Sequence, residues 1–83
     1  MSKINYKMNT EEWQVILRIS TEEGWIDNVE VSFEDGISFP MKFQYIKNGY
    51  AYFVASIPYQ YCNEEKIEEF YFEKNGILCS FFP

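Results

Sequence analysis

Along much of this chain, apolar and polar side chains alternate with a period of two. The alternation is clearest at residues 28–34, where Val29, Val31 and Phe33 are separated by polar residues. A period of two is typical of a strand with one face in the core and the other in solvent. The same pattern predicts further strands at residues 41–46, 50–55 and 70–73. In the first of these, Met41, Phe43 and Tyr45 are expected to share one face.

Turn signals separate the predicted strands. The dipeptides Asp35-Gly36, Asn48-Gly49 and Asn75-Gly76 are strong hairpin signals, because a type I′ turn needs positive φ at both central residues. No long helical repeat interrupts this pattern. Residues 1–83 are therefore predicted to form a single all-β domain, a small antiparallel immunoglobulin-like β-sandwich of six or seven strands.

The segment from Asn9 to Ile19 admits two interpretations. Asn9 and Glu12 have the spacing of a helical cap, and Trp13 is followed by apolar residues at helical spacing. The same Trp13 also begins a strict alternation with Val15, Leu17 and Ile19, in which β-branched residues favour a strand. We predict a strand, with Trp13 inside it and buried. One helical turn is expected farther along, at residues 63–66.

Composition supports a folded domain with a core of large side chains. Aromatic residues make up 20% of the 83 residues, and each buried ring removes about 150–250 Å² of surface from water. The predicted core consists of Val29, Val31, Phe33, Phe53, Phe70 and Phe72.

The formal charge of −6 limits the partners of this chain. An acidic surface repels nucleic-acid phosphates and anionic membranes, so neither is an expected partner. It suits a neutral ligand or a basic protein surface. With no apolar run long enough to span a membrane and no signal-type leader, a cytoplasmic protein is expected. Cys62 and Cys79 are expected to be reduced and partly buried rather than bridged.

Residues for catalysis are missing. The sequence has no histidine, which removes the usual general base and most zinc sites. The glutamate pairs at 64–65 and 68–69 are typical of a solvated face, and Asp27, Glu34 and Asp35 lack the dense pattern of a calcium loop. We predict a protein that binds rather than catalyses, without cofactor or metal.

Trp25 is the first candidate binding residue. It follows Gly24 in a predicted turn, with Asp27 and Asn28 close behind. A tryptophan ring can stack on the apolar face of a sugar while carboxylates and amides bond its hydroxyls. In the alternative interpretation, Trp25 folds back and plugs one end of the sandwich.

Three tyrosines near the Asn48-Gly49 turn form a second candidate site. Tyr45, Tyr50 and Tyr52 could present a platform of rings to a ligand. The alternative is that they pair across neighbouring strands and stabilise the hairpin, at roughly 0.2–1 kcal/mol per pair.

From Trp25 to Gly76 the order of features resembles starch-binding carbohydrate-binding modules of the immunoglobulin-like type. The shared features are Gly24-Trp25, Asn28-Val29, the strand 29–33, Pro40-Met41, the segment Gly49 to Pro58 and the segment Ile67 to Gly76. The resemblance implies a β-sandwich that binds starch or glycogen, with Trp25 as the stacking residue. Ser32 stands where the family often has histidine.

Two functions follow from these observations. The first is a non-catalytic α-glucan-binding module, in which Trp25 stacks on glucose, a tyrosine adds a platform, and Asp27, Asn28 or Asn75 bonds hydroxyls. The second is a small acidic inhibitor of the phage type, such as an anti-CRISPR-like protein. Its carboxylates would imitate phosphates and occupy the basic groove of a nucleic-acid enzyme. The position of the carboxylates relative to Trp25 and the tyrosines distinguishes the two.

Overall fold

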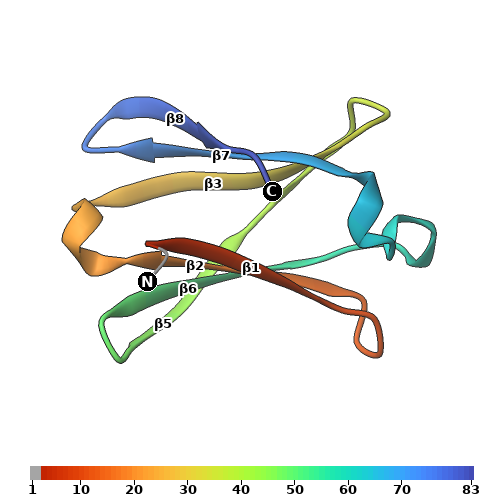
Figure 1. Cartoon of the computed structure of the whole chain (residues 1–83), viewed down its shortest axis with the longest axis horizontal. Coiled ribbons are helices and arrows are strands. Elements are labelled where there is room, and N and C mark those ends of the chain that lie inside the picture. The colour runs from red at the N-terminus through yellow and green to blue at the C-terminus, as the bar shows by residue number, and fades with distance from the viewer. Residues whose placement is uncertain (1–2) are drawn as a thin grey trace.

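The protein, described over residues 3–83 in a computed structural model, consists of two facing antiparallel sheets (Figure 1). The prediction of an all-β sandwich is confirmed, with eight strands in place of six or seven. Sheet I has the order β1-β2-β6-β5, from β1 (Ile4–Asn9), β2 (Gln14–Ser20), β6 (Tyr50–Ser56) and β5 (Lys42–Lys47). Sheet II has the order β4-β3-β7-β8, from β4 (Ser38–Pro40), β3 (Ile26–Phe33), β7 (Ile67–Lys74) and β8 (Ile77–Phe81).

Short 3-10 turns make up the helical part of the described chain. They are η1 (Thr21–Glu23), η2 (Tyr59–Tyr61) and η3 (Glu64–Lys66). The last of them is the turn predicted at residues 63–66, and Asn63 caps it by accepting a hydrogen bond from the Glu65 amide. Within residues 3–83, no helix has the length and apolar character needed to cross a membrane.

The core lies between the sheets and is built from the residues that alternation selects. All six predicted core residues are at most 5% exposed. The strand prediction for β2 is confirmed as well, since Val15, Leu17 and Ile19 are fully buried. Fully burying one such side chain contributes about 1.5–3 kcal/mol. The remaining buried apolar residues are Met41, Ala55, Ile57 and Ile67.

The hairpins form where the dipeptides predict them. Positive φ at both central residues marks type I′ turns at Asn48-Gly49, with values of 52° and 80°, and at Asn75-Gly76, with 51° and 82°. At Asp35-Gly36 only the glycine has positive φ, at 86°. The Gly36 amide donates to the Phe33 carbonyl, and this hairpin therefore has a three-residue loop rather than a type I′ turn.

The prediction that Trp13 is a buried strand residue is wrong. Trp13 lies in the turn before β2, has a φ of 55° and is 49% exposed. The Asn9 side chain accepts hydrogen bonds from the Glu11 and Glu12 amides, both at 3.1 Å. This cap closes a tight turn between two strands, and the turn lifts the Trp13 ring out of the alternation that follows it.

The expectation that Phe43 and Tyr45 share a face is also wrong. A bulge lies between them in β5, so that Phe43 is opposite Phe53 while Tyr45 is opposite Tyr52. Consecutive residues of β6 point to opposite faces of the sheet. Phe43, before the bulge, therefore points toward the space between the sheets, whereas the bulge turns Tyr45 to the outside.

Both cysteines are free thiols and partly buried, as expected.

Candidate functional site

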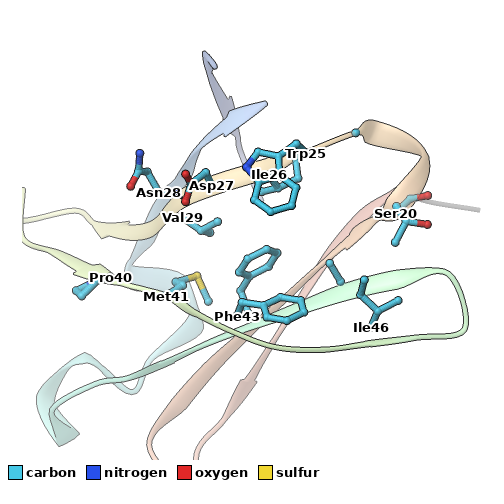
Figure 2. A pocket seen from close by; sticks show the side chains of 14 residues that line it. Ser20, Trp25, Ile26, Asp27, Asn28, Val29, Pro40, Met41, Phe43 and Ile46 are labelled. Carbon is cyan, nitrogen blue, oxygen red and sulfur yellow. Dashed lines mark hydrogen bonds between the residues drawn. The ribbon is translucent and has the colours of Figure 1, made fainter. Parts of the chain in front are cut away.

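A cleft opens where the chain passes from one sheet to the other. β4 pairs with β3 only at Glu30–Ser32, and the chain then crosses to sheet I and continues as β5. The first half of β3 therefore has no strand on that side. The Met41 amide donates to the Val29 carbonyl at 2.8 Å and fixes the crossing point. The resulting cleft between β3 and β5 has a volume of about 650 Å³ (Figure 2).

The cleft has a buried apolar floor and an exposed aromatic rim. Val29, Met41 and Phe53 on the floor are each at most 6% exposed. On the rim, Trp25 comes from the β3 side and Phe43 from the β5 side, as Figure 2 shows, and they are 73% and 56% exposed. The other lining residues are Ser20, Thr21, Gly24, Ile26, Asp27, Asn28, Pro40, Ile46 and Ala51.

Asn75 fixes the backbone of Trp25 from the neighbouring hairpin. The Trp25 amide donates to Asn75 Oδ1 at 3.0 Å, and the Asn75 amide donates to the Trp25 carbonyl at 2.8 Å. Gly24 makes this approach feasible, because a Cβ there would lie 2.8 Å from Asn75 Nδ2. With 73% of Trp25 exposed, the interpretation of this residue as a core plug is wrong.

A bulge in β3 sets the positions of Asp27 and Asn28. Between the Asp27–Glu73 and Glu30–Tyr71 pairs, β3 has one residue more than β7. Asn28 lies in this bulge and has a φ of 48°. Its Nδ2 donates to Glu73 Oε2 at 2.7 Å, and its amide donates to Asp27 Oδ1 at 2.9 Å. Within residues 3–83, Asp27 Oδ2 and Asn28 Oδ1 accept no hydrogen bond, which leaves two oxygens at the rim for hydroxyl donors.

The three candidate tyrosines lie elsewhere, on the outer face of sheet I. The Tyr45 and Tyr52 rings are 5.0 Å apart, and the Arg18 guanidinium lies 4.4 Å from the centre of the Tyr50 ring. The interpretation of the tyrosines as cross-strand partners is thus confirmed for Tyr45 and Tyr52. None of the three lines the cleft, so the sequence-predicted site is divided between two surfaces.

Phe43 and Ile46 are two apolar cleft residues that were not predicted as binding residues. Phe43 lies before the β5 bulge and faces inward, as its partner Phe53 does. Ile46 lies after the bulge, which turns it toward the cleft, and no sequence pattern marks that bulge. Asn75 was predicted to bind sugar hydroxyls. Its Oδ1 instead accepts the hydrogen bond from the Trp25 amide, and the residue is not part of the lining.

Glu23 secures the turn that carries Trp25. Its carboxylate lies 3.3 Å from Lys74 Nζ and 3.6 Å from Lys3 Nζ. The hydrogen bond from Lys74 is the largest cause that holds the pKa of Glu23 below its ordinary value. These contacts connect η1 to β7 and to the N-terminal segment.

Comparison with protein-family models, with curated proteins and with solved structures finds no match to this chain. Among the described residues, no three side chains of the metal-binding types gather closely enough to hold an ion. Every buried side-chain nitrogen or oxygen in that part of the chain has a hydrogen-bond partner.

Proposed function

We propose that the cleft beside Trp25 binds a neutral α-glucan chain and that the protein is a non-catalytic binding module. The proposal rests on the combination of a fixed backbone and an exposed side chain at Trp25. Its backbone is fixed on both sides by Asn75, yet 73% of the residue remains in water. An exposed indole adds little to the core, and a fixed backbone leaves less freedom to lose when a ligand stacks on the ring.

The rest of the cleft suits a sugar. Phe43 offers a second ring on the opposite wall, and Asp27 and Asn28 offer free acceptor oxygens at the rim. Asp27 is the single charged residue of the lining, which favours a neutral ligand over an anion. The volume of about 650 Å³ lies within the range of about 300–1,000 Å³ that is common for ligand sites.

The sequence motifs that resemble starch-binding modules support an α-glucan over other neutral sugars. Gly24-Trp25 and Asn28-Val29 are close neighbours along the chain and Pro40-Met41 lies farther on, and all six residues line the cleft. The part of the resemblance that includes Trp25 is therefore located at the candidate binding site.

Native electrophoresis in gels that contain amylopectin tests the proposal. The wild-type chain should be retarded relative to a gel without polysaccharide, and Trp25→Ala should lose the retardation. Trp13→Ala is the matched control, because it removes the other partly exposed tryptophan and should migrate as the wild type does. Absence of wild-type retardation, or equal retardation of Trp25→Ala, would refute the proposal.

The outer face of sheet II supports a second candidate, the acidic inhibitor. Asp27 is directly opposite Glu73, and Ser32 is opposite Glu69, so these carboxylates share the outer face with Glu30. The described part of this face holds no lysine or arginine. The Tyr71 hydroxyl donates to Glu69, and this hydrogen bond together with nearby glutamates raises the pKa of Tyr71. Such a surface can dock on a basic protein groove.

Inhibition of target-DNA binding by RNA-guided nucleases tests this second candidate. The wild-type chain should inhibit, and Glu30→Gln/Glu69→Gln should inhibit less. Trp25→Ala should inhibit normally, since it leaves the acidic face intact. Lack of inhibition across a panel of such nucleases would remove the anti-CRISPR form of the candidate.

A further inference from the structure

The outer face of sheet I carries a group of basic side chains, although the chain as a whole is acidic. Because Val15 and Leu17 point into the core, Ile16 and Arg18 of β2 point outward. Residues directly opposite on antiparallel strands share a face. The register therefore places the following residues on the outer face: Lys7 opposite Ile16, Tyr52 opposite Arg18, Lys42 opposite Val54, and Lys47 opposite Tyr50.

These residues form rows across the four strands. One row runs Lys7, Ile16, Val54, Lys42, and the next runs Asn5, Arg18, Tyr52, Tyr45. Lys47 stands at the edge beyond them, opposite Tyr50. The outward positions of the four strands of sheet I include four of the chain's seven basic residues and no Asp or Glu.

The four cations make no ion pair within residues 3–83. Both ion pairs of the described chain use Glu23, with Lys3 and Lys74 as the partners. Among the described residues, no carboxylate lies within ion-pair distance of Lys7, Arg18, Lys42 or Lys47. The outer face of sheet II has the opposite composition, with Asp27, Glu30, Glu69 and Glu73 and no described cation.

The two faces also match in spacing. Lys42 and Lys47 are opposite Val54 and Tyr50, four residues apart in β6, which is about 13 Å at 3.3 Å per residue. Glu69 and Glu73 are four residues apart in β7, again about 13 Å. Two sheet faces packed with their strands nearly aligned would bring these pairs together.

We propose that the outer face of sheet I binds the outer face of sheet II of a second copy of this chain. Lys42 and Lys47 of one copy would pair with Glu69 and Glu73 of the next, and Arg18 and Tyr52 would form the centre of the contact. The interface is heterologous, since each copy contributes a different face, and both faces stay available at the ends of a pair. Such a contact adds copies in open chains and does not close at a dimer. The proposal does not depend on glucan binding.

A second copy fits this face better than a nucleic acid does. Binding of single strands to a sheet needs open aromatic faces on which bases stack. Here Tyr45 and Tyr52 lie against each other at 5.0 Å, and Arg18 covers the ring of Tyr50. The acidic face of another copy supplies carboxylates without needing a free ring.

Sedimentation velocity at low and high salt tests the proposal. At about 20 mM NaCl, the mean mass should rise with concentration above the monomer mass of 10.0 kDa, and at about 500 mM NaCl it should return to the monomer. A monomer at every concentration and salt would overturn the proposal. Association that persists unchanged at high salt would overturn it as well, because charge pairing would then not be the cause.

Neutral substitutions on each face provide the decisive control. Lys42→Gln/Lys47→Gln and Glu69→Gln/Glu73→Gln should each associate about tenfold more weakly than the wild type. Mixed together, they should form a one-to-one complex and nothing larger, since each variant keeps one intact face. Circular dichroism and thermal midpoints would verify that both variants fold. Failure of the mixture to associate while the wild type does would contradict the pairing of these two faces.

A labelled oligothymidine probe tests single-stranded nucleic acid as the alternative partner of this face. The wild type should leave the probe unbound at about 20 mM NaCl. Binding that Lys42→Gln/Lys47→Gln abolishes, by a wild-type chain that stays monomeric, would assign the face to single-stranded nucleic acid and overturn the proposal.

Discussion

The two tryptophans stand at opposite ends of β2 and are held in different ways. Trp25 follows the far end of that strand, has its backbone fixed by Asn75, and leaves its ring 73% exposed at the mouth of a cleft. Trp13 precedes the strand, is 49% exposed and packs its ring edge-on against Tyr59 at 5.9 Å. At the Trp13 end the ring is part of the fold. At the Trp25 end only the backbone is part of the fold, and the ring is available.

This difference separates an exposed ring that still packs against the fold from an exposed ring that does not. A ring that packs on another ring stabilises the local structure even when half of it meets water. A ring without such a contact, held on a fixed backbone, adds little to stability and is open to a ligand. Each end also has a carboxylate with a lowered pKa. Glu23 lies in the turn before Trp25, and Asp35 accepts from Tyr61, which belongs to the same short turn η2 as Tyr59, the ring partner of Trp13. The predictions below proceed from the shared core to these end-specific contacts.

Truncation of a side chain in the core between the sheets should have the largest effect on stability. Phe72 is 3% exposed, so Phe72→Ala should lower the free energy of unfolding by about 3–5 kcal/mol through the cavity it leaves. For a domain of this size that is a large part of the total. Urea titration measures it, and a loss below about 1 kcal/mol would show that Phe72 is not a core residue.

Substitution of Gly24, which lies against Asn75, should have the next largest effect on stability. Gly24 has a φ of 96° and a ψ of −157°, a region nearly restricted to glycine, and a Cβ would strike Asn75. Gly24→Ala should therefore cost about 2–4 kcal/mol, from backbone strain and the lost hydrogen bond to Trp25.

Gly36→Ala is the matched control for this substitution. Gly36 also has positive φ, at 86°, but has no atom near the position of a Cβ. Its substitution should cost only the left-handed backbone, about 1–2 kcal/mol. Equal losses for the two variants in urea titration would mean that the approach to Asn75 does not stabilise the fold.

Stability and binding should separate at the two tryptophans. Trp13→Ala should lower the free energy of unfolding by about 1 kcal/mol, because it removes the contact with Tyr59. Trp25→Ala should change stability by no more than about 0.5 kcal/mol. Chemical denaturation compares them, and the reverse order would make Trp25 the structural residue.

Acid should weaken both ends, while salt should weaken one. The hydrogen bond from Tyr61, at 2.7 Å, is the largest cause of the lowered pKa of Asp35, and that from Lys74 is the largest for Glu23. A carboxyl whose pKa is lowered by folding stabilises the fold above its unfolded pKa of about 4. That stabilisation is lost as the pH falls through the folded pKa.

Thermal midpoints between neutral pH and about pH 3, at two salt concentrations, measure this effect. Added salt should reduce the Glu23 contribution, which comes from ion pairs, and spare the neutral Tyr61 donor at Asp35. Glu23→Gln should therefore lose the salt-sensitive part, whereas Asp35→Asn should keep it. The same salt dependence in both variants would contradict this assignment.

The fold was predictable because strand periodicity and turn chemistry agree. Val29, Val31 and Phe33 point inward as their spacing predicts, and the Asn48-Gly49 and Asn75-Gly76 hairpins adopt the turns that Asn-Gly favours. β1 was missed although Ile4, Tyr6 and Met8 alternate with polar residues. The three apolar positions of β1 are only partly buried, at the edge of the sheet.

The site was only partly predictable, because it depends on irregularities. Trp25, Asp27 and Asn28 meet at the cleft as expected, but Ile46 reaches it through the β5 bulge. A bulge changes the face of every residue beyond it, and one extra residue leaves no mark in the composition. The same bulge separates Tyr45 from the cleft, and the cap at Asn9 turns Trp13 out of the core.

The fluorescence of Trp25 during titration with maltoheptaose tests the central claim most directly. The chain has two tryptophans, so Trp13→Phe leaves Trp25 as the sole indole emitter, and Trp25→Phe leaves Trp13. Stacking of a sugar on the ring should shift the emission of Trp13→Phe in a saturable way and leave Trp25→Phe unchanged. A silent Trp13→Phe variant, or an equal response from Trp25→Phe, would contradict the assignment of the Trp25 cleft as the glucan site.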